Sequence, residues 1–197
     1  MATDAERIAA LEAELDAERG ARQALVETSL RLNSLLNLPE LLDAILESAT
    51  GLLDAETSSL LLLDEETNEL VFEVATGESE GLREMRIPAT QGIAGWVLQH
   101  DEPVIVGDVS TDERFYSTVD QSSGFKTRSM LAVPLKIRDH KIGVVEVINK
   151  NGADGFNDRD REIATAFAAQ AAIAIDNARL YRQLADAVVE SRLSYRL

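Results

Sequence analysis

Two apolar runs around a short polar segment constrain the fold of this chain more than any other feature. The runs are Met130–Ile137 and Ile142–Ile148, and the segment Arg138–Lys141 separates them. Both runs are rich in valine, isoleucine and leucine and have the length of ordinary strands, which predicts an antiparallel hairpin. Pro134 has no N–H to give to a central ladder, so we expect an irregularity near it.

One charged residue, Glu146, stands in the middle of the second run, V-V-E-V-I. A carboxylate on a buried strand is unfavourable unless it meets a hydrogen-bond donor or water. Either Glu146 faces solvent on a half-covered sheet, or it accepts a hydrogen bond, for example from an N–H of a bound purine. The pattern makes Glu146 a candidate binding residue.

Residues 4–37 carry a heptad repeat that predicts one long helix. The seam positions are Ile8, Leu11, Leu15, Glu18, Arg22, Leu25, Ser29, Leu32 and Leu36. Glu18, Arg22 and Ser29 are poor core residues, so a coiled coil built on this seam would be imperfect. The helix either forms a parallel dimeric coiled coil, which the repeat and its charged flanks favour, or packs as an amphipathic helix on its own domain.

The middle of the chain alternates between helical and strand-like patterns. We predict helices at 38–54 and 92–100, strands at 58–63, 70–75 and 103–106, and a loop at 76–84. Ser110 and Glu113, three residues apart, fit either a capping box at a short helix or a plain surface loop. The start of such a helix would offer free N–H groups to an anion.

The last predicted helix begins after Asn157 and continues to near the C-terminus, with many alanines that favour helix and close packing. At about 1.5 Å per residue it is far longer than the sheet that it would cover. We therefore divide the chain into a coiled-coil helix at 1–36, a compact domain at 37–182 and a projecting helix at 183–197. Residues 1–36 and about 180–197 are expected to lie outside the compact body.

Composition excludes several classes of protein. The net charge is −16, which argues against nucleic acid or an anionic membrane as the main partner. The absence of cysteine excludes disulfides, thiolate chemistry and Cys-ligated zinc. No run reaches the roughly 18 apolar residues of a membrane span, and the N-terminus lacks a signal-peptide core. We expect a cytoplasmic protein.

Four segments resemble the GAF domain family, small-molecule sensors related in shape to PAS domains. They are I-P-A-T-Q-G-I-A-G-W-V, F-Y-S-T-V-D-Q-S-S-G-F-K-T-R-S-M-L, I-G-V-V-E-V-I-N-K and F-N-D-R-D. They are most similar to the GAF modules of cyclic-nucleotide phosphodiesterases and class III adenylyl cyclases. The resemblance implies an α+β fold, with an antiparallel sheet, helices packed on one face and extended N- and C-terminal coiled-coil-type helices.

The last two segments resemble the signature of cyclic-nucleotide-binding GAF domains. The matching residues are Asn149, Lys150, Phe156 and Asp160, and Arg161 stands where the signature has glutamate. In the family this signature acts mainly as a structural clasp, in which the lysine and the aspartate pair. The resemblance therefore implies an ion pair between Lys150 and Asp160.

The ligand pocket of the family maps onto positions scattered along the chain. By resemblance, the ligand-binding residues are Ser59, Ala75, Thr76, Ala94, Asp120, Ser123, Thr127 and Glu146. Binders of this class often carry an aromatic–acidic pair after the second strand, where this chain has Ala75 and Thr76. The base would lose a stacking partner there, which is worth about 1–3 kcal/mol where it has been measured.

Other chemistries known in the family find little support in the sequence. Methionine-sulfoxide reduction and covalent bilin attachment need cysteine, which the chain lacks. Haem needs an axial ligand, and His100 and His140 are both expected to be exposed. No catalytic triad, metal-ligand spacing or phosphate-binding loop appears, so we predict a regulatory domain, not an enzyme, with no catalytic or metal site and no required cofactor.

Two hypotheses from different classes remain. In the first, a small molecule such as cAMP or cGMP binds and alters the geometry of a parallel homodimer. In the second, a ligand-free GAF domain only dimerises and relays strain, or senses another ligand. The terminal S-R-L-S-Y-R-L ends within a predicted helix, so we expect a signalling helix that leads to an output domain absent from this chain, such as a cyclase, phosphodiesterase or kinase.

Overall fold

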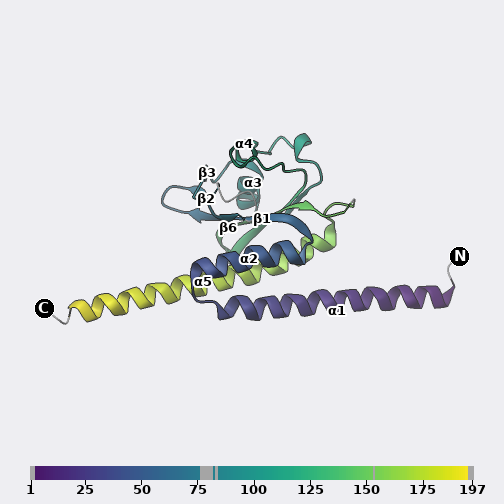
Figure 1. Ribbon diagram of the computed structural model, residues 1–197, viewed down its shortest axis with the longest axis horizontal. Coiled ribbons are helices and arrows are strands. Elements are labelled where there is room, and N and C mark those ends of the chain that lie inside the picture. Colours follow the sequence, from purple (N-terminus) through teal and green to yellow (C-terminus); the bar gives the residue numbers. More distant parts are fainter. Residues whose placement is uncertain (1–2, 76–81, 83, 153, 195–197) are drawn as a thin grey trace.

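A six-stranded antiparallel sheet separates three long helices from a layer of short helices and loops (Figure 1). The structure, a computed structural model, describes residues 3–75, 82, 84–152 and 154–194. The helices are α1 (Asp4–Ser34), α2 (Leu38–Leu52), α3 (Gly92–His100), η2 (Val109–Thr111, a 3-10 turn), α4 (Thr118–Ser123) and α5 (Asp158–Ser194). The strands are β1 (Ala55–Asp64), β2 (Glu69–Ala75), β3 (Arg86–Pro88), β4 (Val104–Val106), β5 (Met130–Ile137) and β6 (His140–Lys150).

The sheet has the strand order β3-β2-β1-β6-β5-β4, so β1 and β6 lie at its centre. The predicted hairpin is confirmed as β5 and β6. Pro134 lies opposite Val144, and the ladder becomes irregular one step further on, between Leu135 and Lys136. A proline is tolerated here because β4 pairs only with residues 130–132 of β5, which leaves that side of Pro134 outside the ladder.

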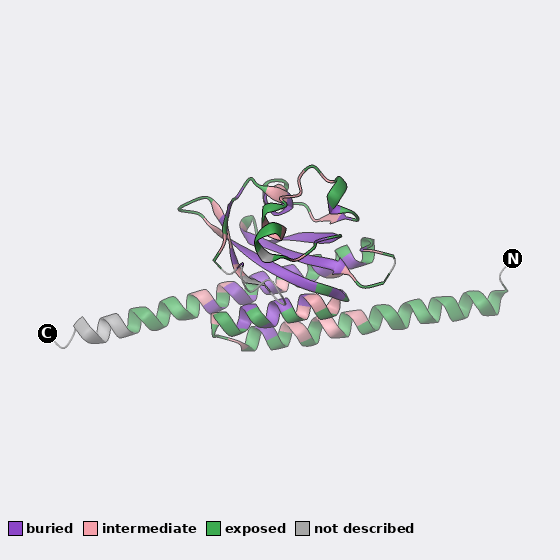
Figure 2. Cartoon of the chain, turned by 45° about the horizontal axis from the view of Figure 1, so that its top comes forward, coloured by how far each residue is buried: buried purple, intermediate pink, exposed green. Residues whose placement is uncertain are grey.

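The helices α2 and α5 cover one face of the sheet, as predicted, and α1 packs on these two helices. α2 turns Leu41, Leu42, Ile45, Leu46 and Ala49 toward the core. On α5 the buried positions are mostly alanines, and these small side chains let the helix lie close to the sheet. Figure 2 shows that burial is concentrated in the sheet and in the parts of the helices beneath it.

The end of α1 does not stand outside the domain, and that expectation for residues 1–36 is wrong for its last turns. Leu32 is fully buried in the core with α2 and α5. Ser29 Oγ donates a 2.8 Å hydrogen bond to Gln170 Oε1 of α5. The two helices run in the same direction (Figure 1). A polar residue such as Ser29 fits between them because the residue that faces it on α5, Gln170, is also polar. The first half of α1 does project, and Leu11 is 64% exposed.

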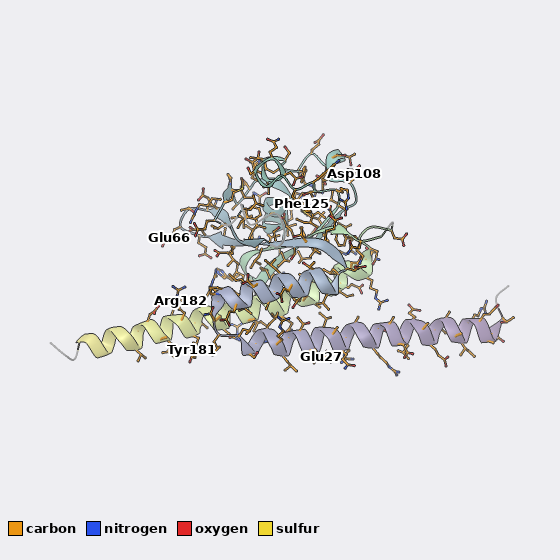
Figure 3. The ribbon with its side chains drawn as sticks, viewed as in Figure 1. Glu27, Glu66, Asp108, Phe125, Tyr181 and Arg182 are labelled. Atoms are coloured by element: carbon orange, nitrogen blue, oxygen red, sulfur yellow. The ribbon has the colours of Figure 1, made fainter. Side chains whose placement is uncertain are left out.

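The end of α5 leaves the domain, as expected. Leu180, Leu184 and Val188 are exposed, and Tyr181 and Arg182 lie on this projecting part (Figure 3). None of the described helices is long and apolar enough to cross a membrane.

The opposite face of the sheet is covered by α3, η2, α4 and their loops. The predicted helix at 92–100 is confirmed as α3. The Ser110–Glu113 capping box does not form, because the Asp108 carboxylate accepts from Ser110 N at 2.9 Å and from Ser110 Oγ at 2.6 Å. These bonds close the 3-10 turn η2, and the helical segment begins later, at Thr118. The short strand β3 has no counterpart in the sequence prediction.

Candidate ligand-binding cavity

A cavity lies between the central strands and the layer formed by α3 and α4. The space between its atoms is about 610 Å³ when the solvent in its open mouth is counted. The part that the centres of water molecules can reach is about 50 Å³, room for only a few waters. Its lining comprises Thr57, Ser58, Ser59, Leu61, Phe72, Leu82, Ile87, Gly92, Ile93, Ala94, Phe115, Tyr116, Val119, Asp120, Phe125, Thr127, Met130, Glu146 and Ile148.

The floor of the cavity carries a paired hydroxyl and carboxyl group. Ser59 and Glu146 are directly opposite each other on β1 and β6, and Ser59 Oγ donates a 3.1 Å hydrogen bond to Glu146 Oε2. Glu146 is only 7% exposed. Burial raises the pKa of Glu146 to about 7, against the lowering effect of the Ser59 bond and with a further rise from the Asp120 charge. The solvent-facing interpretation of Glu146 is therefore wrong.

The wall of the cavity is held by a second acid, Asp120 of α4. Asp120 Oδ2 accepts from Thr127 N at 2.8 Å, and Asp120 Oδ1 accepts from Thr127 Oγ1 at 2.7 Å. These two bonds fix the segment that precedes β5 against α4. Asp120, Thr127 and Glu146 thus meet around one cavity, although they belong to α4, to the segment before β5 and to β6.

The structure describes the remaining ligand-binding positions suggested by the resemblance to different extents. Ala94 lines the cavity from α3. Ala75 is the last residue of β2 and pairs with Ser59 in register, and its side chain lies outside what is described. Ser123 ends α4, and its side chain is likewise not described. Thr76, together with most of the predicted loop at 76–84, lies outside the described residues.

The first turn of α3 forms part of the cavity lining. Gly92 begins the helix with a φ of +75°, a value that glycine adopts without strain. Gln91 makes no side-chain capping bond, and Gly92, Ile93 and Ala94 all line the cavity. N–H groups in a first turn have no intrahelical partner, so this end of α3 suits an anion.

The clasp residues lie just outside the cavity, where β6 ends and α5 begins. Lys150 Nζ is 3.0 Å from Asp160 Oδ1 and also donates a 2.7 Å bond to the carbonyl oxygen of Leu53. Asp160 and Asn157 cap α5 reciprocally, with bonds of 3.0 and 3.1 Å between side chain and backbone. Lys150 Nζ lies 5.9 Å from the ring centroid of Phe156. The structure therefore brings three of the four signature residues into one contact group.

Asn149, the fourth signature residue, connects this group to the cavity wall. It is fully buried and has a φ of +58°. Its Oδ1 accepts from Arg128 N at 2.7 Å and Ser129 N at 3.2 Å, and its Nδ2 donates to Glu56 Oε2 and the Lys126 carbonyl. Because Arg128 and Ser129 follow Thr127 directly, Asn149 helps to hold Thr127 in place.

Sequence reasoning missed several residues of this site. Glu56 also forms an ion pair with Arg128, and neither residue stood out in the sequence. Phe115, Tyr116 and Phe125 line the cavity, and Phe125 lies in the layer above the sheet (Figure 3). The signal that could have found them is three aromatic residues in a stretch of otherwise polar sequence, since large rings in a loop need a surface to pack against.

Neither histidine lines the cavity. His100 stacks on Trp96 with ring centroids 4.2 Å apart, and His140 Nε2 lies 3.2 Å from Glu65 Oε1 on the surface. Among the described residues there is no group of three or more His, Cys, Asp or Glu side chains that could hold a metal ion. The described cavity thus offers hydrogen bonds, apolar surface and two acids.

An antiparallel sheet with a capped cavity on one face and long helices on the other defines a small α+β domain suited to enclosing a ligand. The GAF domain family matches residues 37–175, and the chain belongs to this family.

Relatives and solved structures agree with this assignment. The chain is 31% identical over 84% of its length to the probable 3',5'-cyclic phosphodiesterase pde-5 of Caenorhabditis elegans. It is 30% identical over 83% of its length to the dual 3',5'-cyclic-AMP and -GMP phosphodiesterase 11A of Takifugu rubripes. The matches span only 23% and 19% of these relatives. The GAF domain of a phosphoenolpyruvate-protein phosphotransferase from Coxiella burnetii superposes with a TM-score of 0.74 at 19% identity, covering 83% of this chain and 96% of that domain.

Proposed function

We propose that this GAF domain is a regulatory module that binds a cyclic nucleotide, cAMP or cGMP, in the cavity between the sheet and α3. The observation that carries the proposal is the meeting of Ser59, Asp120, Thr127 and Glu146 around one cavity. The relatives with the same domain include phosphodiesterases that act on cyclic nucleotides by name.

The chemistry of the lining suggests how the ligand is oriented. The cyclic phosphate would lie at the first turn of α3, where the N–H groups of Gly92, Ile93 and Ala94 offer donors and a favourable dipole. The base would then face Glu146 and Ser59 on the floor. Phe115, Tyr116 and Phe125 supply apolar ring surface that compensates in part for the missing aromatic partner at Ala75 and Thr76.

The part of the cavity that water centres reach, about 50 Å³, is too small for a nucleotide in the present arrangement. Binding would therefore displace part of the layer that contains α4. A rearrangement of this kind is what a sensor needs, because a ligand shifts an equilibrium only through its different affinities for two arrangements.

The proposed relay runs through the long helices. The Asn149–Lys150 end of β6 contacts both the cavity wall and, through Asp160, the start of α5. Residues 37–182 would form the sensing domain, and residues 183–197 a signalling helix toward an output domain. The exposed apolar side chains on the projecting parts of α1 and α5 include Ile8, Leu11, Leu15, Leu180, Tyr181, Leu184 and Val188. We include in the proposal a parallel homodimer in which a second copy covers them.

Isothermal titration calorimetry with cAMP and cGMP tests the binding proposal. Thr127→Val and Glu146→Ala should each weaken binding by roughly tenfold or more, since each removes a polar contact from the cavity. Thr165→Val is the matched control, because Thr165 is exposed on α5 and its hydroxyl donates to the Arg161 carbonyl of the same helix. Failure of both nucleotides to bind at millimolar concentration would retire the cyclic-nucleotide proposal.

The narrowness of the cavity favours one alternative, a ligand-free module that only dimerises and relays strain. Sedimentation velocity separates the two functions when it is combined with Leu11→Glu and Leu184→Glu variants. A relay module gives a dimer that these variants disrupt, and its calorimetric response to either nucleotide is flat. A sensor gives the same dimer together with saturable binding.

A further inference from the structure

The charged groups among the described lining residues are all of one sign. Among the described lining residues, Asp120 and Glu146 are the acids, and the lining contains no arginine, lysine or histidine. Tyr116 is the other titratable side chain of the lining. A cyclic nucleotide carries one negative charge on its phosphate, so an ionised Glu146 would be the third negative charge in a small, largely apolar space.

The two acids have different surroundings. Asp120 accepts two hydrogen bonds from Thr127, one on each carboxylate oxygen. Glu146 is 7% exposed and accepts from the neutral Ser59 hydroxyl. Burial and its raised pKa make Glu146 the group that takes up a proton when an anionic ligand enters the cavity.

We propose that Glu146 meets the base of the bound nucleotide as a neutral carboxylic acid, so that the cavity selects adenine over guanine and takes up a proton on binding. This inference rests on the proposed function. A neutral carboxylic acid presents one O–H donor and one carbonyl acceptor. Adenine presents the complementary pair, the N1 acceptor beside the N6 amino donor. Guanine presents two adjacent donors, N1–H and N2–H, which match an ionised carboxylate instead.

The electrostatics point in the same direction. Like charges in a poorly solvated site repel each other strongly, and protonation of Glu146 removes two such repulsions, toward Asp120 and toward the phosphate. Burial already raises the pKa of Glu146 to about 7 before any ligand enters. Near neutral pH the proton is thus gained with little additional free energy.

The test is calorimetry of cAMP and cGMP binding between about pH 6 and about pH 8.5, in buffers of different ionisation enthalpy. We expect cAMP to bind more tightly than cGMP and its affinity to fall up to about tenfold per pH unit above the pKa of Glu146. The buffer dependence should show proton uptake approaching one per cAMP at the alkaline end. Glu146→Gln, which keeps one donor and one acceptor, should retain cAMP binding and lose the pH dependence. Glu113→Gln, at an exposed position, is the matched control and should behave like the native chain.

Each other outcome overturns the inference. Tighter binding of cGMP with proton release, binding of cAMP without proton uptake, or loss of cAMP binding in a folded Glu146→Gln variant each contradicts it and leaves the proposed function intact. Absence of binding by both nucleotides at every pH contradicts the proposed function as well. A carboxyl ¹³C titration of Glu146 in the ligand-free protein provides a check without ligand, and a normal glutamate pKa there also overturns the inference.

Discussion

Lys150 and Asp160 form an ion pair, 3.0 Å from Nζ to Oδ1, that joins the end of β6 to the first turn of α5. The two side chains are 17% and 10% exposed. Lys150 also donates to the Leu53 carbonyl, and Asp160 also accepts from Asn157 N. The pair is therefore desolvated yet well supplied with hydrogen bonds, which is the condition under which a buried ion pair contributes to stability.

Lys150→Met should lower the free energy of unfolding by about 3 kcal/mol, because it leaves the Asp160 carboxylate buried without its cation. Urea denaturation followed by circular dichroism measures the change. The control is Lys136→Met, whose partner Asp101 and own side chain are 37% and 43% exposed, and it should change stability by less than about 1 kcal/mol. Equal effects for the two variants would show that the Lys150 pair is no more than a surface contact.

Asn149→Ala should destabilise the domain by about 3 kcal/mol or more. The change strands the N–H groups of Arg128 and Ser129, and each buried unsatisfied group costs about 1–3 kcal/mol. The variant also places alanine at a position with a left-handed backbone angle, which is strained for alanine. Asn151→Ala, which removes one exposed bond to Asp54, is the matched control. A loss below about 1 kcal/mol for Asn149→Ala would mean that the network does not hold the wall as described.

The raised pKa of Glu146 predicts how the free energy of unfolding depends on pH. Its pKa is about 7 in the folded state and 4.5 in the reference state, so the unfolded chain loses this proton first as pH rises. Its contribution to the free energy of unfolding therefore falls between about pH 4.5 and about pH 7 and is constant above, by at most about 3 kcal/mol in total.

Denaturation curves of the native chain and of Glu146→Gln isolate this contribution, since other acids affect both proteins alike. The difference in stability, native minus variant, should decline across that pH range. A difference that is flat with pH, or one that rises, would contradict the assignment of a raised pKa to Glu146.

Gly95→Ala tests the close approach of α3 to the segment before it. A Cβ at Gly95 would lie 2.5 Å from the Thr90 carbonyl carbon, so the backbone must shift. Thermal denaturation should show a loss of about 1–3 kcal/mol. Gly51→Ala, also in a helix but with open space around its Cβ, should be neutral or stabilise by up to about 1 kcal/mol. Equal stability of the two variants would mean that α3 is not packed as the structure has it.

The hairpin could be predicted from local pattern alone because two apolar runs of strand length flank a short polar segment. Val145 and Val147 pack against the long helices, whereas Glu146 between them faces the cavity. The position of Glu146 in an apolar run was thus enough to single it out. Its hydrogen-bond partner, Ser59, and its acidic neighbour, Asp120, were identified by family resemblance and not by spacing.

Contacts between distant segments could not be predicted in this way. Asn149 bonds to Glu56, 93 residues away in the chain, and no periodicity relates the two. The expectation that residues 1–36 lie outside the body also fails for the last turns of α1, because Ser29 looks like a defect in a coiled-coil seam and instead bonds to Gln170 of α5. The capping box of Ser110 and Glu113 does not form for a local reason. The Ser110 N–H, which would donate to the Glu113 side chain in a capping box, donates to the Asp108 carboxylate instead.

The most direct test of the account is methyl NMR of protein labelled with ¹³C-methyl methionine and titrated with cAMP. Met130 lines the cavity, and Met85 does not. The account predicts that the Met130 signal, assigned through Met130→Leu, shifts most and saturates at the calorimetric affinity. A Met130 signal that stays in place while cAMP binds, or the absence of any binding at millimolar concentration, would contradict it.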